Sequence, residues 1–137
     1  MEKVFHFDSP QEVYTADACV ISCFDARFDI ALRKFLKRSG IQTFDHIKIP
    51  GSAKTLAAPA SASDRDLVIA MIRTSRRLHR PGRLLLIAHR ECGAYEGVPL
   101  EVVVSDVVCA AGVILAAEPT LPVECYFNDF DGIYRIR

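Results

Sequence analysis

Two short apolar runs each lead directly into a motif that contains cysteine. Residues 18–22 precede the motif CFDAR at 23–27, and residues 84–88 precede the motif HRECG at 89–93. Apolar runs of this kind are typical of strands that are covered on both faces of a sheet. The pattern therefore predicts that each motif begins where a buried strand ends.

Strand and helix patterns alternate along the rest of the chain. We expect strands over residues 18–23, 44–49, 84–88, 123–127 and 133–136. We expect helices over 29–39, from a cap at Ser63 or Asp64 to His79, and over 100–117, with a loop or weak helical turn over 52–62. Such alternation is typical of an α/β fold with a mostly parallel central sheet flanked by helices.

The expected strand order places the two motifs side by side. With the first strand central, the second on one side of it and the third on the other, the order is 2-1-3-4, with a short fifth strand at the edge. Ligands bind outside the carboxyl ends of strands where such an order reverses. Adjacent strands lie about 4.8 Å apart. Cys23 and His89 should therefore face one another there, with Cys92 one tight turn further on.

Length and composition favour one cytoplasmic domain over residues 1–137, with 1–17 as an N-terminal arm. The 17 basic and 17 acidic residues balance, which argues against nucleic acid or an anionic membrane as a partner. No run reaches the ~18 apolar residues of a membrane span, and the N-terminus lacks the apolar segment of a secretory signal. Cysteines in a reducing compartment are more typically buried, catalytic or metal-bound than paired in disulfides.

The two motifs together supply a ligand set that suits zinc. Cys23, His89 and Cys92 offer two thiolates and one imidazole. Three protein ligands leave a fourth position for water or a carboxylate, which is the catalytic pattern rather than the closed structural one. Zinc lowers the pKa of its water from about 15.7 toward about 7. We therefore interpret the site as one that activates water.

Asp25 and Arg27 follow the first thiolate closely enough to act on the same site. Arg27 can hold Asp25 in a bidentate pair, and Asp25 can then accept a hydrogen bond from the zinc-bound hydroxide and orient it. If the pair opens, Asp25 can itself take the fourth zinc position and switch the site off. The alternative for this motif is a local turn with an Asp–Arg salt bridge.

The other cysteines and histidines have simpler interpretations. Three cysteines lie inside apolar runs and are expected to be buried small hydrophobic residues: Cys19, Cys109 and Cys125. Three histidines lack comparable partners: His6, His46 and His79. Near the end of a helix, His79 is expected to complement the helix dipole.

The motif CxDxR followed by HxxCG on this alternation resembles the β-class carbonic anhydrases. The resemblance extends from residue 18 to residue 137, and segment 129–134 is similar to the family's closing hairpin without its Thr. It implies Zn2+ bound by the two cysteines and the histidine, with Asp25 and Arg27 as the orienting and gating dyad. The activity that it implies is reversible hydration of CO2 to bicarbonate by a zinc-bound hydroxide.

The resemblance also implies a homodimer or a higher homo-oligomer. Segment 100–117 is apolar on most sides, so it should be buried by more than one neighbour. The chain departs from the family in its short lead-in, which leaves the helices that embrace a partner subunit reduced or absent. Gly51-Ser52 replaces the Gly-Asn of the family's loop.

Three alternatives lead to different chemistry. Relatives of this fold resemble hydrolases of carbonyl sulfide or carbon disulfide, which are related small electrophiles. A catalytically silent zinc-binding interaction protein on the same scaffold would keep Asp25 fixed on zinc. A thiol phosphatase would need an Arg at a set distance after its cysteine, where Asp29 and Val98 stand instead.

Overall fold

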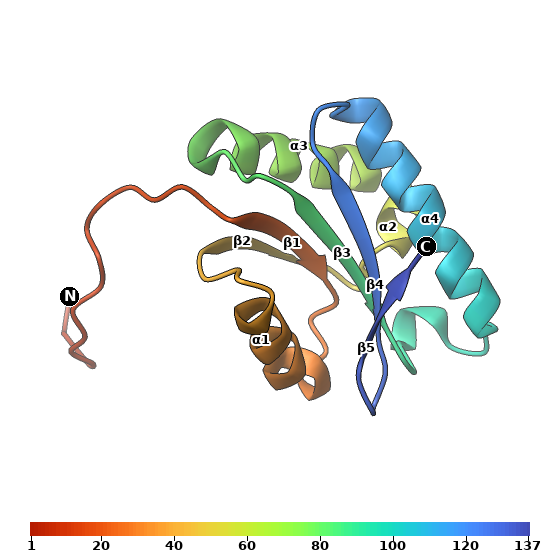
Figure 1. Cartoon of the computed structure of the whole chain (residues 1–137), viewed down its shortest axis with the longest axis horizontal. Coiled ribbons are helices and arrows are strands. Elements are labelled where there is room, and N and C mark those ends of the chain that lie inside the picture. The colour runs from red at the N-terminus through yellow and green to blue at the C-terminus, as the bar shows by residue number, and fades with distance from the viewer.

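A five-stranded sheet in the order β2-β1-β3-β4-β5 forms the centre of the computed structural model, which describes residues 1–137 (Figure 1). The strands are β1 (Ala18–Ser22), β2 (Phe44–Lys48), β3 (Leu84–His89), β4 (Val123–Asn128) and β5 (Ile133–Ile136). The first four are parallel, and β5 pairs antiparallel with β4. The predicted fold class and the strand order 2-1-3-4 with a short edge strand are therefore confirmed.

Helices cover both faces of this sheet (Figure 1). α1 (Asp29–Arg38) lies on one face, while α2 (Lys54–Ala57), α3 (Ala62–His79) and α4 (Leu100–Ala117) lie on the other. Alternate strand residues point to opposite faces, so Val20 of β1 packs toward α1 and Ile21 packs toward α3 and α4. Every residue of β1 and β3 is buried, which explains why their sequences are continuous apolar runs.

The start of α3 differs from the prediction. Ser61, rather than Ser63 or Asp64, is the N-cap, and its side chain accepts a hydrogen bond from the backbone N–H of Asp64. The Asp64 carboxylate in turn accepts from the backbone N–H of Ser61, so the two residues form a reciprocal capping box. Segment 52–62 contains one short helix, α2, before this cap.

The N-terminal residues run away from the domain as an extended tail (Figure 1). They are exposed as far as Thr15, and the chain becomes buried at Ala16, whose backbone N–H donates to the carbonyl of His79. The carboxylate of Asp17 accepts from the backbone N–H groups of Gln42 and Thr43. These contacts fix the point at which the chain enters β1.

The long helix α4 is buried on only one side within this chain. Its inner residues pack on the sheet: Val103, Val107, Ala110 and Ile114. Its outer face leaves Val108 and Leu115 exposed within this chain. By length and composition alone α4 is apolar enough to cross a membrane, so the expectation that no segment reaches that limit is wrong. Its packing on β3, β4 and α2 gives it the place of a core helix.

Candidate metal centre

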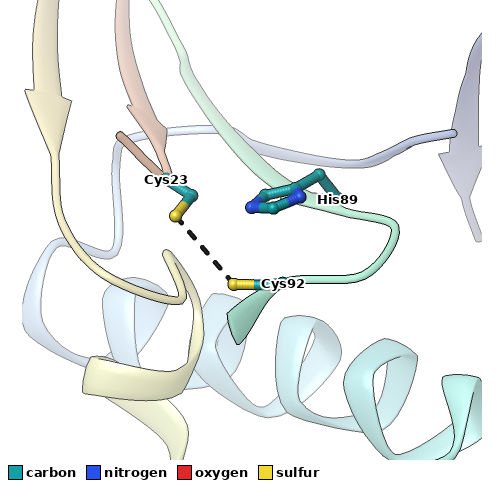
Figure 2. A group of neighbouring side chains, drawn as sticks. All are labelled: Cys23, His89 and Cys92. Atoms are coloured by element: carbon teal, nitrogen blue, oxygen red, sulfur yellow. Dashed lines mark hydrogen bonds between the residues drawn. The ribbon is translucent and has the colours of Figure 1, made fainter. Parts of the chain in front are cut away.

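Three side chains converge at the carboxyl edge of the sheet, as the strand order predicts (Figure 2). Cys23 follows β1, His89 is the last residue of β3, and Cys92 lies in the turn after β3. Their ligand atoms all lie within 4.8 Å of one another, and the two sulfur atoms are 3.9 Å apart. The structure therefore brings together the three ligands that the sequence predicts, in a donor set that suits zinc.

The imidazole of His89 is held in one orientation and one tautomer. Its Nδ1 lies 2.8 Å from the carbonyl oxygen of Arg90, which can only accept, so Nδ1 carries the proton. Nε2 therefore has a free lone pair, and it is buried without a hydrogen-bond partner. A buried acceptor without a hydrogen-bond partner lowers the stability of the folded protein. A metal ion bound to Nε2 would remove that cost. An outer partner of this kind is typical of zinc-bound histidine.

The sulfur of Cys92 lies in an environment with opposing effects. Burial, together with the neighbouring Cys23, raises the pKa of the Cys92 thiol, while backbone N–H groups of Ala94 and Gly51 act to lower it. The N–H groups stabilise the thiolate, which is the form that binds a metal. The site therefore disfavours two adjacent thiolates on its own, and a divalent cation would reverse that balance.

The loop after β2 packs directly against the Cys92 turn. Gly51 and Ser52 both have positive φ, of 69° and 51°, so the chain reverses sharply there. A Cβ at Gly51 would lie 2.9 Å from the Cβ of Ala94, and Lys54 donates a hydrogen bond to the Ala94 carbonyl. Sequence reasoning noted this loop but assigned it no role at the site. The dipeptide Pro50-Gly51, which is typical of a sharp turn, was the available sequence signal for this loop.

Asp25 and Arg27 form a close ion pair beside the three ligands. Arg27 Nη2 lies 2.7 Å from Asp25 Oδ2, and Arg27 Nε lies 3.1 Å from both carboxylate oxygens. The backbone N–H of Arg27 also donates to Asp25 Oδ1, so Asp25 caps the 3-10 helix Ala26–Phe28. The hydrogen bonds from Arg27 lower the pKa of Asp25 to about 2. The carboxylate is therefore ionised at neutral pH.

Arg27 also links the first motif to the second. Its Nη2 donates to the backbone carbonyl of Glu91 at 3.1 Å, and its Nη1 lies 3.6 Å from the Glu91 carboxylate. Glu91 adopts positive φ, of 52°, which belongs to the tight turn between His89 and Cys92. The dyad and the turn that carries two of the metal-ligand candidates thus form one connected unit.

The family match covers both the sheet and this site. Residues 14–135 match the protein family described as “Putative carbonic anhydrase”. The chain belongs to this carbonic anhydrase family. The matched segment includes both motifs and continues into β5, in agreement with the resemblance found from the motifs.

Two curated relatives match part of this carbonic anhydrase family member. They are uncharacterized proteins from Rickettsia bellii (strain RML369-C) and Rickettsia conorii (strain ATCC VR-613 / Malish 7), each 29% identical over 82 residues, or 59% of this chain. The matches cover 50% and 44% of those proteins. The chain thus spans about half the length of the curated relatives it matches.

Solved structures share the fold at low sequence identity. A carbonic anhydrase from Streptococcus mutans has a TM-score of 0.68 at 11% identity, covering 96% of this chain and 89% of that chain. A β-carbonic anhydrase from Trichomonas vaginalis has a TM-score of 0.67 at 10% identity, covering 96% and 87%. The apo form of a carbon disulfide hydrolase has a TM-score of 0.58 at 13% identity, covering 90% and 81%. At these identities the likeness establishes the fold.

The remaining cysteines of this carbonic anhydrase family member lie away from the site. Cys19 is buried as predicted, whereas Cys125 is only partly buried. Cys109 is exposed, so the prediction of burial is wrong for it, because it lies on the outer side of α4. No disulfide links any of the five cysteines.

Two histidines have partners that sequence reasoning missed. His46 Nε2 lies 2.7 Å from Ser22 Oγ on the neighbouring strand. His79 Nδ1 lies 2.8 Å from Asp45 Oδ1, and its ring stacks on Tyr14 with centroids 4.0 Å apart. His79 therefore connects α3 to β2 and to the N-terminal segment, instead of serving only the helix dipole.

Proposed function

We propose that this chain catalyses the reversible hydration of CO2 to bicarbonate with zinc as its metal. The observation that carries the proposal is the convergence of the Cys23, His89 and Cys92 ligand atoms beside the Asp25–Arg27 ion pair. Membership of the carbonic anhydrase family and the shared fold support it. The resemblance of the motifs assigns the same roles to the same residues.

The donor set fits a catalytic zinc. Cys23, Cys92 and the unpartnered Nε2 of His89 would hold the ion, and their number leaves a position for a reactant. When bound, zinc supplies a Lewis acid that makes water a nucleophile near neutral pH. The backbone N–H groups of Gly51 and Ala94 favour the thiolate of Cys92, which is the form required for binding.

Asp25 supplies an acceptor of fixed direction beside that position. Its carboxylate is ionised and can only accept hydrogen bonds, so it orients an attacking water through that water's proton. Arg27 donates from Nε and Nη2 and thereby keeps the carboxylate away from the ligand set. A preorganised acceptor of this kind requires no rearrangement at the moment of reaction.

An aromatic ring shields the site from the α1 side. Phe28 is buried and lies against the imidazole of His89, with ring centroids 4.6 Å apart. It limits the access of water to the back of the ligand set. On the other side, a pocket of about 570 Å³ reaches His89 and Cys92 between the turn and α4. This pocket is the proposed route for a small, uncharged substrate.

Stopped-flow CO2 hydration on zinc-loaded protein, combined with metal analysis, tests the proposal. We expect zinc near one per chain and catalysed hydration that disappears when the metal is removed. Stoichiometric zinc without hydration of CO2 would show that the activity is wrong while the metal site is right. That result would leave a zinc-binding interaction protein on the same scaffold.

A second candidate is a hydrolase of carbonyl sulfide or carbon disulfide. The fold match to a carbon disulfide hydrolase supports this candidate. Attack on any of these linear electrophiles would use the same three metal-ligand candidates. The zinc ligands do not separate these substrates. Parallel assays of CO2, carbonyl sulfide and carbon disulfide on one preparation decide between them through the ratio of kcat/KM values.

The proposal also includes assembly and location. We propose a cytoplasmic homodimer or a dimer of dimers, in keeping with the resemblance to the β-class enzymes. The exposed apolar face of α4 supports assembly, because Val108 and Leu115 have no partner within one chain.

A further inference from the structure

The guanidinium of Arg27 is in contact with two aromatic rings as well as with acidic groups. Its Cζ lies 5.5 Å from the centroid of Phe28 and 5.7 Å from that of Phe130. Both distances are within the range in which a cation is attracted to the face of a ring. Asp25 and Glu91 provide the charged contacts. Arg27 therefore contacts groups from several parts of the chain, although its side chain is 48% exposed.

Phe130 comes from the turn between β4 and β5, far from Arg27 in the sequence. The turn is closed by backbone hydrogen bonds between Asp129 and Gly132, and the Asp129 carboxylate accepts from the backbone N–H of Phe130. The same carboxylate forms a bidentate pair with Arg90, at 2.6 Å from Nη2 and 3.1 Å from Nε. Arg90 lies between His89 and Cys92, so the hairpin is fixed to the turn that carries two metal-ligand candidates.

The rings also form a stack that ends on a metal-ligand candidate. Phe130 stacks on Phe28 with centroids 5.5 Å apart, and Phe28 lies against His89 at 4.6 Å. Phe28 is buried, but Phe130 is 61% exposed. A large ring kept at the surface contributes little to the core. Its contacts with Arg27 and Phe28 therefore account for its position.

We propose that Phe130 is a positioning residue that holds the Arg27 guanidinium on Asp25. With Arg27 confined by the ring, the Asp25 carboxylate stays paired and does not turn toward the ligand set. This role rests on the proposed function, since it concerns the dyad beside the metal. It assigns the hairpin between β4 and β5 to the site, although the hairpin contributes no ligand.

The matched variants separate the ring from the hairpin. Phe130→Ala removes the ring, Phe130→Leu keeps apolar bulk without a ring, and Phe130→Tyr keeps the ring. Tyr134→Ala is the control. Tyr134 lies in β5 of the same hairpin and is 52% exposed, and its hydroxyl donates to Asp131 without contacting Arg27. The Tyr134→Ala variant therefore alters the same hairpin without removing a contact of the dyad.

The decisive measurement is the exchange of the Arg27 Nε proton with water, followed by NMR on 15N-labelled full-length protein. The Nε–H donates to Asp25 in the wild type, so its exchange is slowed. We expect exchange to be faster by about two- to fivefold in Phe130→Ala and Phe130→Leu. Phe130→Tyr and Tyr134→Ala should exchange as the wild type does. In an active enzyme, kcat/KM should fall by a similar factor in the first two variants.

Unchanged exchange in both Phe130→Ala and Phe130→Leu would overturn the assignment, and so would equal acceleration in Tyr134→Ala. If Phe130→Ala does not fold, the exchange rates of Phe130→Leu and Phe130→Tyr still test whether the ring holds Arg27 on Asp25. The exchange measurement does not depend on turnover. A protein inactive toward CO2 would refute the proposed function, while the exchange rates would still test the role of Phe130.

Discussion

Cys92 is one of the two proposed sulfur ligands, and its replacement tests the metal site most directly. A hydroxyl is a poor zinc ligand at neutral pH. Cys92→Ser should therefore lower zinc affinity by more than about 100-fold, which is a larger loss than the removal of a hydrogen-bond partner of a ligand usually causes. The exposed Cys109 is the matched control, because Cys109→Ser changes the same atoms away from the site. Metal content after dialysis against a chelator is the measurement. Full zinc occupancy in Cys92→Ser would refute the ligand assignment.

Asp25 has a structural role and a proposed catalytic role, which mutation can separate. As the cap of a 3-10 helix, its loss in Asp25→Ala should cost about 1 kcal/mol of unfolding free energy. If it orients the reacting water, kcat/KM should also fall by about tenfold or more, with zinc still bound. Asp25→Asn keeps an oxygen for the Arg27 N–H and therefore isolates the effect of charge.

The same pair supports a double-mutant cycle. Arg27→Ala should be similarly damaging, because it frees Asp25 to move toward the ligand set. The double variant should lose much less activity than the two single losses combined, since the residues act as one unit. Steady-state kinetics of the four proteins give the coupling. Additive losses would show that the pair only stabilises a turn.

Gly51 allows a test of the loop that packs on Cys92. Alanine at Gly51 or Gly40 meets a positive φ, of 69° or 74°, and this backbone strain alone should cost about 1 kcal/mol of stability at either position. Only Gly51→Ala also collides with Ala94, whereas Gly40 has open space. We expect zinc affinity to fall by about tenfold in Gly51→Ala and to stay unchanged in Gly40→Ala. Equal affinities would mean that the loop does not position Cys92.

At the scale of elements, the sequence predicted the strands that are covered on both faces of the sheet. β1 and β3 are buried throughout and therefore read as apolar runs, and the strand order brought Cys23 and His89 to one edge. The cap of α3 was misplaced because several polar residues precede the helix. The spacing of Ser61 and Asp64 was the distinguishing signal. Pro50-Gly51 signals a turn, but the contacts of Gly51 and Ala94 with Cys92 were missed because they are made by backbone N–H groups, which leave no side-chain pattern.

Glu118 joins two elements and gives a pH-dependent prediction. It follows α4 and pairs with Arg73 and Arg76 of α3, and hydrogen bonds from these arginines lower its pKa. Because the folded pKa lies below the ordinary value of 4.5, the stabilisation is present above that value and is lost as pH falls through the folded pKa.

Glu118→Gln should therefore unfold more easily at neutral pH, by about 1 kcal/mol. The difference from wild type should shrink at about pH 3. Urea unfolding at both pH values measures it, with Glu12→Gln in the exposed N-terminal tail as the control. A difference that persists unchanged at low pH would show that the glutamate acts through packing instead of charge.

The whole molecule gathers distant segments at one edge of the sheet. Cys23 follows β1, Gly51 follows β2, His89 ends β3 with Cys92 in the turn after it, and Phe130 follows β4. Parallel strands make this possible, because each carboxyl end lies at the same edge. α4 covers one face of this sheet, and its first turn lines the pocket at the same edge through Leu100 and Val103. The outer side of α4, in contrast, exposes Val108 and Leu115 within this chain.

A homodimer or a dimer of dimers would cover that face. Val108 and Leu115 are seven positions apart, which places them on one side of α4, and they are 53% and 42% exposed. Exposed apolar residues grouped on one helix favour association. We expect sedimentation equilibrium at micromolar concentration to give a dimer or a tetramer.

The double variant Val108→Asp/Leu115→Asp should sediment as a folded monomer, with the circular dichroism of the wild type. Ile30, which is exposed on α1 of the opposite layer, provides the control variant Ile30→Asp, which should leave assembly unchanged. A wild-type monomer would contradict the proposed assembly, and a double variant that still associates would place the interface elsewhere on the molecule.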